Sequence, residues 1–334
     1  MGVDLVYNTG WELGSRTVLN DNFDNNFTAI RTDIVRNGTY SFSGSGYGHG
    51  DARNARIRLA ASDNELWTRM GFYVTVANPQ QRNILEFWHE DHTVQIVVRI
   101  DVDRKLQIVN GAGNSVLATA TDPLTETSWE LVEIHVLCAN AGGAVDVYVN
   151  GVTTGKGVTF SGDTQNHASS DQIRKIAISS EYIYDDFAVS VTGLIGDGRG
   201  ILLKPNGAGN YTDLTRGGTD SGANWSQVDE LPPNDATDDV LSATADQKDT
   251  YATANPTNVG AVNAVTFLAR ATMSDAGPAN FRHFWRSTSD AESAADIALT
   301  QSWVTYREIT VTKPGGGAWD ATALNNLEPG VKVR

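Results

Sequence analysis

The chain has little cysteine, no long hydrophobic run and fewer basic than acidic residues. It has one cysteine in 334 residues, so it cannot form an internal disulfide. No stretch approaches the roughly 18 consecutive apolar residues of a membrane-spanning helix. With 40 Asp and Glu against 25 Lys and Arg, the formal net charge is −15. That charge argues against partners whose surfaces are rich in phosphate, both nucleic acid and anionic membrane.

The first residues, "MGVDLVYNTG", show no basic segment followed by an apolar one, so we expect no secretory signal. Val6 stands where a myristoylation pattern needs Ser or Thr. Cys138 lies in the apolar segment "LVEIHVLCA", where we expect a buried small side chain and not a nucleophile. These features predict a chain that folds in a reducing cytoplasm without covalent cross-links.

Period-two alternation of apolar and polar residues is common, and helical periodicity is nearly absent, which is typical of strands with one buried face. In "VQIVVRIDVD" (94–103) the even positions are apolar, while Gln95 and Arg99 lie on the other face. "AVDVYVNG" alternates in the same way and ends in Asn150–Gly151, a favoured type I′ hairpin turn. The sequence therefore predicts an all-β protein of antiparallel sheets packed face to face.

The clearest domain boundary is the glycine-rich segment "VTGLIGDGRG" (191–200). It separates a unit at 1–193 from one at 200–334, each of ordinary domain size. In the second unit a long polar region, 207–257, precedes strands that resume near Val262. It contains "DELPPNDATDD", which favours a solvated loop. We predict two antiparallel β-sandwich, jelly-roll-like domains in tandem.

Three motifs in the first unit occur in the order found in one family. They are "NGTYSFSGSG" (37–46), "TSWELVEIHVLCANAGGAVDVYVNG" (127–151) and "RKIAISSEYIYDDFAVSV" (174–191). Together they resemble the concanavalin-like, laminin-G-type sandwich family over most of residues 1–193. The resemblance implies that Asp185 and Asp186, which precede the last apolar residues, orient turn amides. Calcium binding by this pair is the alternative, and no other cofactor is expected.

The C-terminal segment "WVTYREITVTKPGGGAWDATALNNLEPGVKVR" (303–334) resembles modules of tailed-phage structural proteins. There a strand is followed by a proline-glycine turn, a tryptophan, a short segment and a final strand. The preceding "GANWSQVDELPPNDATDDVL" resembles the same modules. The resemblance implies a virion component that folds in the host cytoplasm and is displayed on the particle surface.

Enzymatic and metal chemistry find little support in the sequence. A retaining glycosidase on this fold needs two carboxylates about 5 Å apart. Laminarinase-type glycosidases, which share the sandwich, place them in the strand pattern E-x-D-x-x-E, and this sequence lacks that pattern. In "ILEFWHEDH", Glu86 and Glu90 are expected on one face, with Trp88 between them. "HEDH" (89–92) is the densest group of metal-ligand types. It lacks a third or fourth convergent ligand, so we interpret it as a polar hairpin tip.

Two tryptophans, Trp225 in "GANWSQ" and Trp319 in "GGGAWDA", lie in loop contexts. They are the candidates for an exposed platform that contacts a protein or a glycan. The other six tryptophans lie in or beside strand patterns, where core packing is the default.

We therefore expect a non-enzymatic structural protein of a tailed-phage virion, most of all a capsid decoration protein on the outer shell. Its partners would be the major capsid protein or other virion proteins, and copies of itself in a homo-oligomer. One alternative is a tail- or fibre-associated adhesion protein that binds a host surface glycan. Another is a bacterial carbohydrate-binding module.

Overall fold

The computed structural model is nearly all β, which confirms the predicted fold class. The chain divides into two compact units between residues 200 and 201. Among the described residues, no helix is long and apolar enough to cross a membrane. The structure describes residues 5–9, 48–49, 55–74, 81–111, 115–178, 183–196, 198, 201–218, 222–230, 233, 235, 237–257, 259–274 and 277–334.

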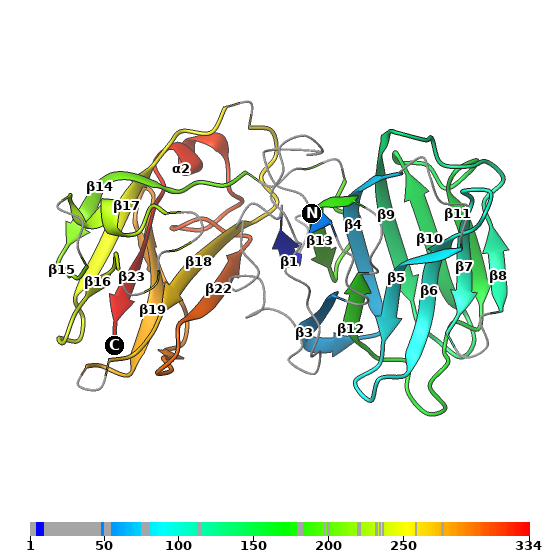
Figure 1. Cartoon of the computed structure of the whole chain (residues 1–334), viewed down its shortest axis with the longest axis horizontal. Helices are drawn as coiled ribbons and strands as arrows, with labels where there is room; N and C mark the ends of the chain where they lie inside the picture. The colour runs from blue at the N-terminus through cyan, green and yellow to red at the C-terminus, as the bar shows by residue number, and fades with distance from the viewer. Residues whose placement is uncertain are drawn as a thin grey trace. The chain divides into compact units, whose positions relative to one another are not determined.

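The first unit consists of two antiparallel sheets arranged in two layers (Figure 1). The first sheet has the order β1 (Leu5–Thr9), β13 (Ile183–Ser190), β4 (Glu65–Tyr73), β9 (Trp129–Leu137), β10 (Gly143–Val149) and β11 (Val158–Gly162), with β2 (Gly48–His49) beside β13. The second sheet has the order β3 (Ala55–Asp63), β12 (Ile173–Ile178), β5 (Arg82–Trp88), β6 (Val94–Ile100), β7 (Leu106–Asn110) and β8 (Val116–Thr119).

Strand β10 follows the alternation that its sequence predicts. Val145, Val147 and Val149 are buried, and the residues between them are partly exposed. At the end of the strand, Asn150 and Gly151 have φ of 52° and 86°, so the predicted type I′ turn is present. Burial of one apolar face per strand builds the core of this unit.

Strand β6 departs from the prediction, because both of its faces are buried. Gln95 is 0% exposed and Arg99 9% exposed, although both were expected on a solvent face. The residues between β11 and β12, here called the 163–172 loop, hydrogen-bond to the Gln95 side chain, and Arg99 Nε donates to Gln107 Oε1 at 2.8 Å. Val102 is 55% exposed, since the strand ends at Ile100.

The motif at 174–191, which resembles the closing strand of the sandwich family, forms two strands and contributes to both sheets. Strand β12 pairs with β3 and β5 in the second sheet. Strand β13 pairs with β1 and β4 in the first sheet. The motif at 37–46, which resembles an early strand of the same family, lies outside the described residues.

In the described part of the second unit, an antiparallel sheet is accompanied by two two-stranded ribbons and two single-turn helices (Figure 1). The sheet has the order β14 (Pro205–Thr212), β17 (Lys248–Thr253), β23 (Glu328–Val333), β19 (Asn280–Arg286) and β20 (Asp290–Glu292), with β21 (Ile297–Ala298) beside β19. The ribbons pair β15 (Thr215–Arg216) with β16 (Val240–Leu241), and β18 (Val265–Ala271) with β22 (Val304–Thr310). The helices are η2 (Asn224–Gln227) and α2 (Ala321–Asn325).

The polar region 207–257 is not an extended loop, and the prediction that strands resume only near Val262 was wrong. Strand β17 lies inside the sheet, and Asp249 and Thr250 on it are fully buried. The Asp249 carboxylate accepts hydrogen bonds from Leu214 N at 2.8 Å and Asn224 Nδ2 at 2.6 Å. A strand of this composition can lie inside a sheet because its buried polar groups are paired.

An aromatic cluster forms the core of the second unit. The Phe267 and Trp285 rings stack with centroids 4.5 Å apart, and the centroid of Trp319 lies 6.5 Å from that of Phe267. Trp319 is 3% exposed, and its Nε1 donates to Thr310 O at 3.2 Å. Asp320 caps α2 by accepting from Ala323 N, so the helix begins directly after this anchor.

Replacement of Trp319 should destabilise the second unit strongly. We expect Trp319→Ala to lower the free energy of unfolding by about 3–5 kcal/mol, because it leaves a cavity among buried aromatic rings. The matched control is Trp225→Ala, which removes a partly exposed ring and should cost clearly less. Urea unfolding of the full chain, followed by circular dichroism, measures both. Equal losses would contradict the assignment of Trp319 to the core.

Candidate functional site

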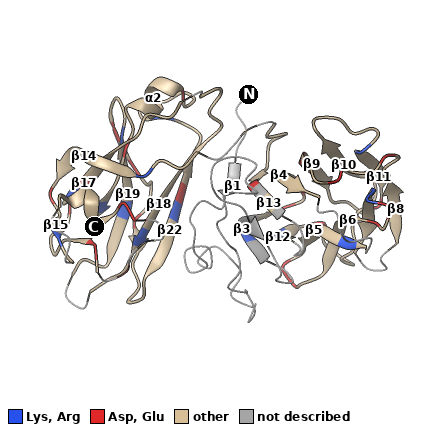
Figure 2. Ribbon diagram, turned by 45° about the horizontal axis from the view of Figure 1, so that its top comes forward, with Lys and Arg blue, Asp and Glu red and all other residues tan. Residues whose placement is uncertain are grey.

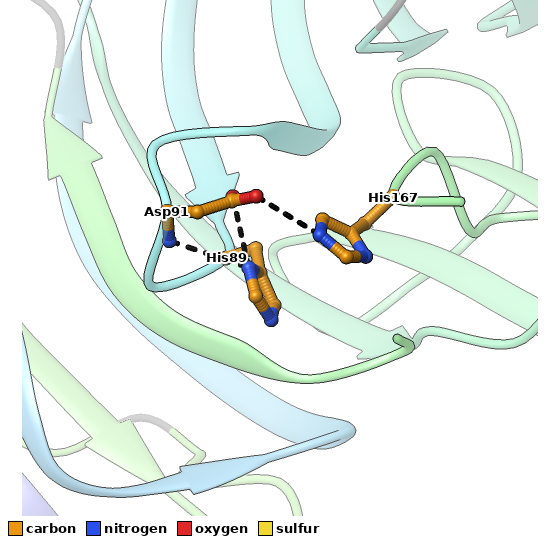
Figure 3. Close-up of side chains that lie close together, drawn as sticks. All are labelled: His89, Asp91 and His167. Carbon is orange, nitrogen blue, oxygen red and sulfur yellow. Dashed lines mark hydrogen bonds and ion pairs between the residues drawn. The ribbon is translucent and has the colours of Figure 1, made fainter. Parts of the chain in front are cut away.

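Three side chains with metal-ligand chemistry converge at one end of the first unit (Figure 3). His89 and Asp91 lie in the tight turn between β5 and β6, and His167 lies in the 163–172 loop. In the turn, His89 N donates to Thr93 O at 2.8 Å, and His92 adopts a φ of 75°. This geometry directs the His89 and Asp91 side chains toward the incoming loop (Figure 3).

The Asp91 carboxylate bridges a nitrogen of each imidazole. Its Oδ1 is 2.9 Å from His89 Nδ1, and its Oδ2 is 2.9 Å from His167 Nε2. The two rings stack with centroids 4.1 Å apart. The His89 and His167 side chains are 18% and 19% exposed, whereas Asp91 is 49% exposed, so the cluster is half-buried and open to solvent on the carboxylate side.

Hydrogen bonds keep the Asp91 carboxylate ionised. Thr93 N donates to Oδ1 at 2.9 Å, and this bond, together with the contact to His89, holds the pKa of Asp91 well below its usual range. The Asp91 carboxylate is therefore a stable negative charge beside two ring nitrogens.

The buried side chain of Gln95 places His167 beside the turn. Its Oε1 accepts from Asn166 N at 2.7 Å and His167 N at 2.8 Å, and its Nε2 donates to Ser170 O at 2.9 Å. Asn166 Nδ2 also donates to Val94 O at 2.7 Å. Because Gln95 follows the turn on β6, these bonds join the 163–172 loop to the strand that carries the other two residues.

The sequence interpretation of "HEDH" as a polar hairpin tip without a third convergent ligand did not anticipate that His167 joins His89 and Asp91. His167 is 76 residues from Asp91 in sequence, and no spacing rule links them. Glu90 does not join the cluster; it pairs with Arg58 and, at 3.5 Å, with Arg174. The one local signal was Gln95 among the apolar residues at the start of β6, since an amide buried there needs hydrogen-bond partners from another segment.

The two glutamates considered for glycosidase chemistry do not form a pair. Strand β5 ends at Trp88, so Glu90 lies in the turn and does not share a strand face with Glu86. Glu86 is 9% exposed and accepts from Asn83 Nδ2 at 2.6 Å and Trp88 Nε1 at 2.9 Å. Its carboxylate orients the Trp88 indole.

Asp186 lies at an irregularity where the pairing of β13 with β4 shifts between Asp185 and Ala188. It is 3% exposed, it has a φ of 51°, and its carbonyl accepts from Arg69 NH1 at 3.0 Å. The Asp185 side chain lies outside the described residues. The position of Asp186 is that of a bulge residue, and its left-handed backbone suits Asp better than most residues.

The remaining candidate residues, two tryptophans and the cysteine, differ in how far their side chains are buried. Trp319 is part of the core, so it is not the exposed platform that the sequence suggested. Trp225 is partly exposed in η2. Burial raises the pKa of the Cys138 thiol to about 12, which leaves no thiolate for nucleophilic chemistry.

An aromatic surface that the sequence did not single out lies on the outer face of the first sheet. The Trp67 ring stacks on His135 at 4.7 Å, and the His135 nitrogens contact Glu65 and Asp146 at 3.0 Å each. The alternation of β4 and β9 places these side chains opposite the buried core. Tyr73 and Trp129 make an edge contact at 5.3 Å further along the same two strands.

No family model matches the sequence, and no protein of curated function matches it. Similar solved structures include the cellulose-induced protein Cip1, which is 13% identical with a TM-score of 0.37 over 49% of this chain and 88% of that one. The alginate lyase Aly36B is 12% identical, with a TM-score of 0.34 over 46% and 83%. The Caenorhabditis elegans galectin LEC-6 is 14% identical, with a TM-score of 0.30 over 43% and 94%.

Likenesses of this extent carry no argument about activity or ligand. The two antiparallel sheets of the first unit are themselves compatible with a concanavalin-like sandwich. The fold thus defines a two-unit β protein. Its first unit is a two-sheet β-sandwich, and its second unit is a smaller β domain.

Replacement of Asp186 tests its structural role. Asp186→Ala should lower the free energy of unfolding by roughly 1–3 kcal/mol, because alanine tolerates a φ of 51° less well than aspartate does in this buried bulge. Asp186→Asn is the control; it tolerates the positive φ and should cost less. Thermal unfolding with and without Ca²⁺ checks both. A calcium-dependent rise in melting temperature that Asp186→Ala abolishes would favour the metal role instead.

Proposed function

We propose that the chain is a non-enzymatic structural protein of a tailed-phage particle, displayed on the outer shell of the capsid. One observation carries the proposal. The segment 303–334, which resembles modules of tailed-phage structural proteins, supplies β22, α2, β23 and the buried Trp319 of the second unit. The segment is therefore the framework of a folded unit and not an appended tail.

The ion pairs of the second unit suit a particle protein that must stay folded outside a cell. Basic and acidic positions are interspersed over its strands (Figure 2). Six of them form a closed ring in which charges alternate: Arg282, Glu292, Lys332, Asp246, Arg334 and Asp296. Single exposed pairs contribute little, but a network shares the ordering cost among several contacts. The ring joins β19, β20 and β23.

The chemistry of the first unit supports a non-enzymatic role. The Glu86 carboxylate is occupied by Asn83 and Trp88, and the Cys138 thiol is buried. Neither group is available to attack a substrate or to pair with a second catalytic residue.

A second candidate function is adhesion to a host surface glycan from a tail or fibre position. The partly exposed Trp67 ring, which stacks on His135 beside Glu65 and Asp146, favours it. Aromatic rings beside carboxylates can stack on a sugar ring and accept hydrogen bonds from its hydroxyls.

Binding to assembled heads tests the main proposal. The full chain should co-sediment with undecorated capsids and saturate at a copy number in the hundreds per particle. We assign docking to the second unit, so a fragment 200–334 should bind and a fragment 1–193 should not. Binding of the first fragment alone would reverse that assignment. Binding of the full chain to host cells or purified tails, with none to heads, would favour adhesion.

Hydrolase activity should be absent. Incubation with laminarin, agarose, alginate and cell-wall glycans should release no reducing sugar above a blank, because the described acidic residues include no carboxylate pair at β5. Glu86→Gln serves as the matched variant. Turnover by the wild type that Glu86→Gln abolishes would contradict the non-enzymatic proposal.

A further inference from the structure

We propose that His89, Asp91 and His167 bind a divalent transition-metal ion, with Zn²⁺ as the best fit. The proposal is independent of the virion role. Two imidazole nitrogens and one carboxylate form a ligand set suited to Zn²⁺ and related ions. Ca²⁺ fits poorly, because it takes six to eight oxygen ligands.

The spacing of the donor atoms matches a small tetrahedral ion. The three ligand atoms lie within 4.8 Å of one another. A Zn²⁺ ion bound at roughly 2.0–2.1 Å to each ligand holds them about 3.4 Å apart. Asp91 offers one oxygen to the ion, so the 2.9 Å contact of that oxygen with its imidazole nitrogen would open by about half an ångström. The other imidazole nitrogen, which now contacts the second carboxylate oxygen, would move to about 3.4 Å from the bound oxygen. Side-chain rotations suffice for both changes.

Metal binding exchanges the ring tautomers. Without metal, hydrogen bonding of neutral rings to the Asp91 carboxylate requires protons on His89 Nδ1 and His167 Nε2, at the expense of the longer contact of 3.3 Å from Asp91 N to His89 Nδ1. With metal, those nitrogens present lone pairs, and the proton of each neutral ring moves to its other nitrogen. In His167 that nitrogen is Nδ1, so its contact of 3.3 Å with Ser169 N gives way.

The backbone positions of the ligands are already fixed. The β5–β6 turn is closed by its own hydrogen bonds, and the buried Gln95 holds the amides of Asn166 and His167. A bound ion would therefore add a covalent-like link between two segments that already touch, at little ordering cost. Since Asp91 is about half exposed, the fourth coordination position of the metal ion would remain open to water or to a ligand from a partner.

A second histidine shows what a site of this kind requires. His135 also contacts two carboxylates at 3.0 Å, but Glu65 and Asp146 lie at opposite ring nitrogens. Their oxygens do not converge on one point with a ring nitrogen. Only the His89–Asp91–His167 cluster among the described residues brings three ligand atoms together.

Calorimetric titration of the full chain with Zn²⁺ tests the proposal. The protein is used without an affinity tag, after treatment with EDTA and dialysis, at neutral pH. We expect one Zn²⁺ per chain and a melting temperature that rises with Zn²⁺ concentration. Co²⁺ should give the visible absorption of a tetrahedral complex, and Ca²⁺ should not compete.

Variants locate the ion. His89→Ala and His167→Ala should each weaken binding by at least about tenfold. Asp91→Asn keeps an oxygen for Thr93 N and should also weaken binding, so it decides the question if a histidine variant does not fold. The control is His92→Asn in the same turn, which suits the φ of 75° and should bind like the wild type.

Two results would overturn the assignment. One is an absence of Zn²⁺ binding by the folded wild type. The other is equal Zn²⁺ affinity in the wild type, His167→Ala and Asp91→Asn, which would place the ion elsewhere. Equal competition by Ca²⁺ would contradict the choice of a transition metal.

Discussion

The need to cover every apolar strand face governs this protein. A half-buried strand such as β10 needs one covering layer, which the opposite sheet supplies. Strand β6 is buried on both faces, so a second cover is required, and the 163–172 loop contributes it. Gln95 makes that cover specific, because its amide can be buried only if the loop backbone satisfies it.

The candidate metal site follows from the same constraint. The loop that satisfies Gln95 must carry Asn166 and His167 past the end of β6, and the β5–β6 turn ends there. The Asp91 carboxylate, kept ionised by the hydrogen bond from Thr93 N, then contacts one nitrogen of each histidine ring. A folding requirement thus sets the backbone of the site, and three side chains set its chemistry.

The second unit must bury polar groups inside its sheet, since its strands are more polar than those of the first unit. Asp249 is buried inside the sheet and is stabilised by amide donors, although burial raises the pKa of its carboxyl. The aromatic cluster around Trp319 supplies the apolar core, and the ring of alternating charges links the strands at the surface.

Local rules determined the all-β class, the β10 strand and the turn at Asn150–Gly151, because alternation and turn chemistry act between neighbouring residues. The same rules missed β17, whose polar residues are buried only because amides from distant segments pair with Asp249. The same rules predicted that Trp319 is an exposed loop residue, whereas its ring is part of the core of the second unit. His167 joined His89 and Asp91 only through tertiary structure, since packing of a loop on a strand joins residues that no sequence spacing relates.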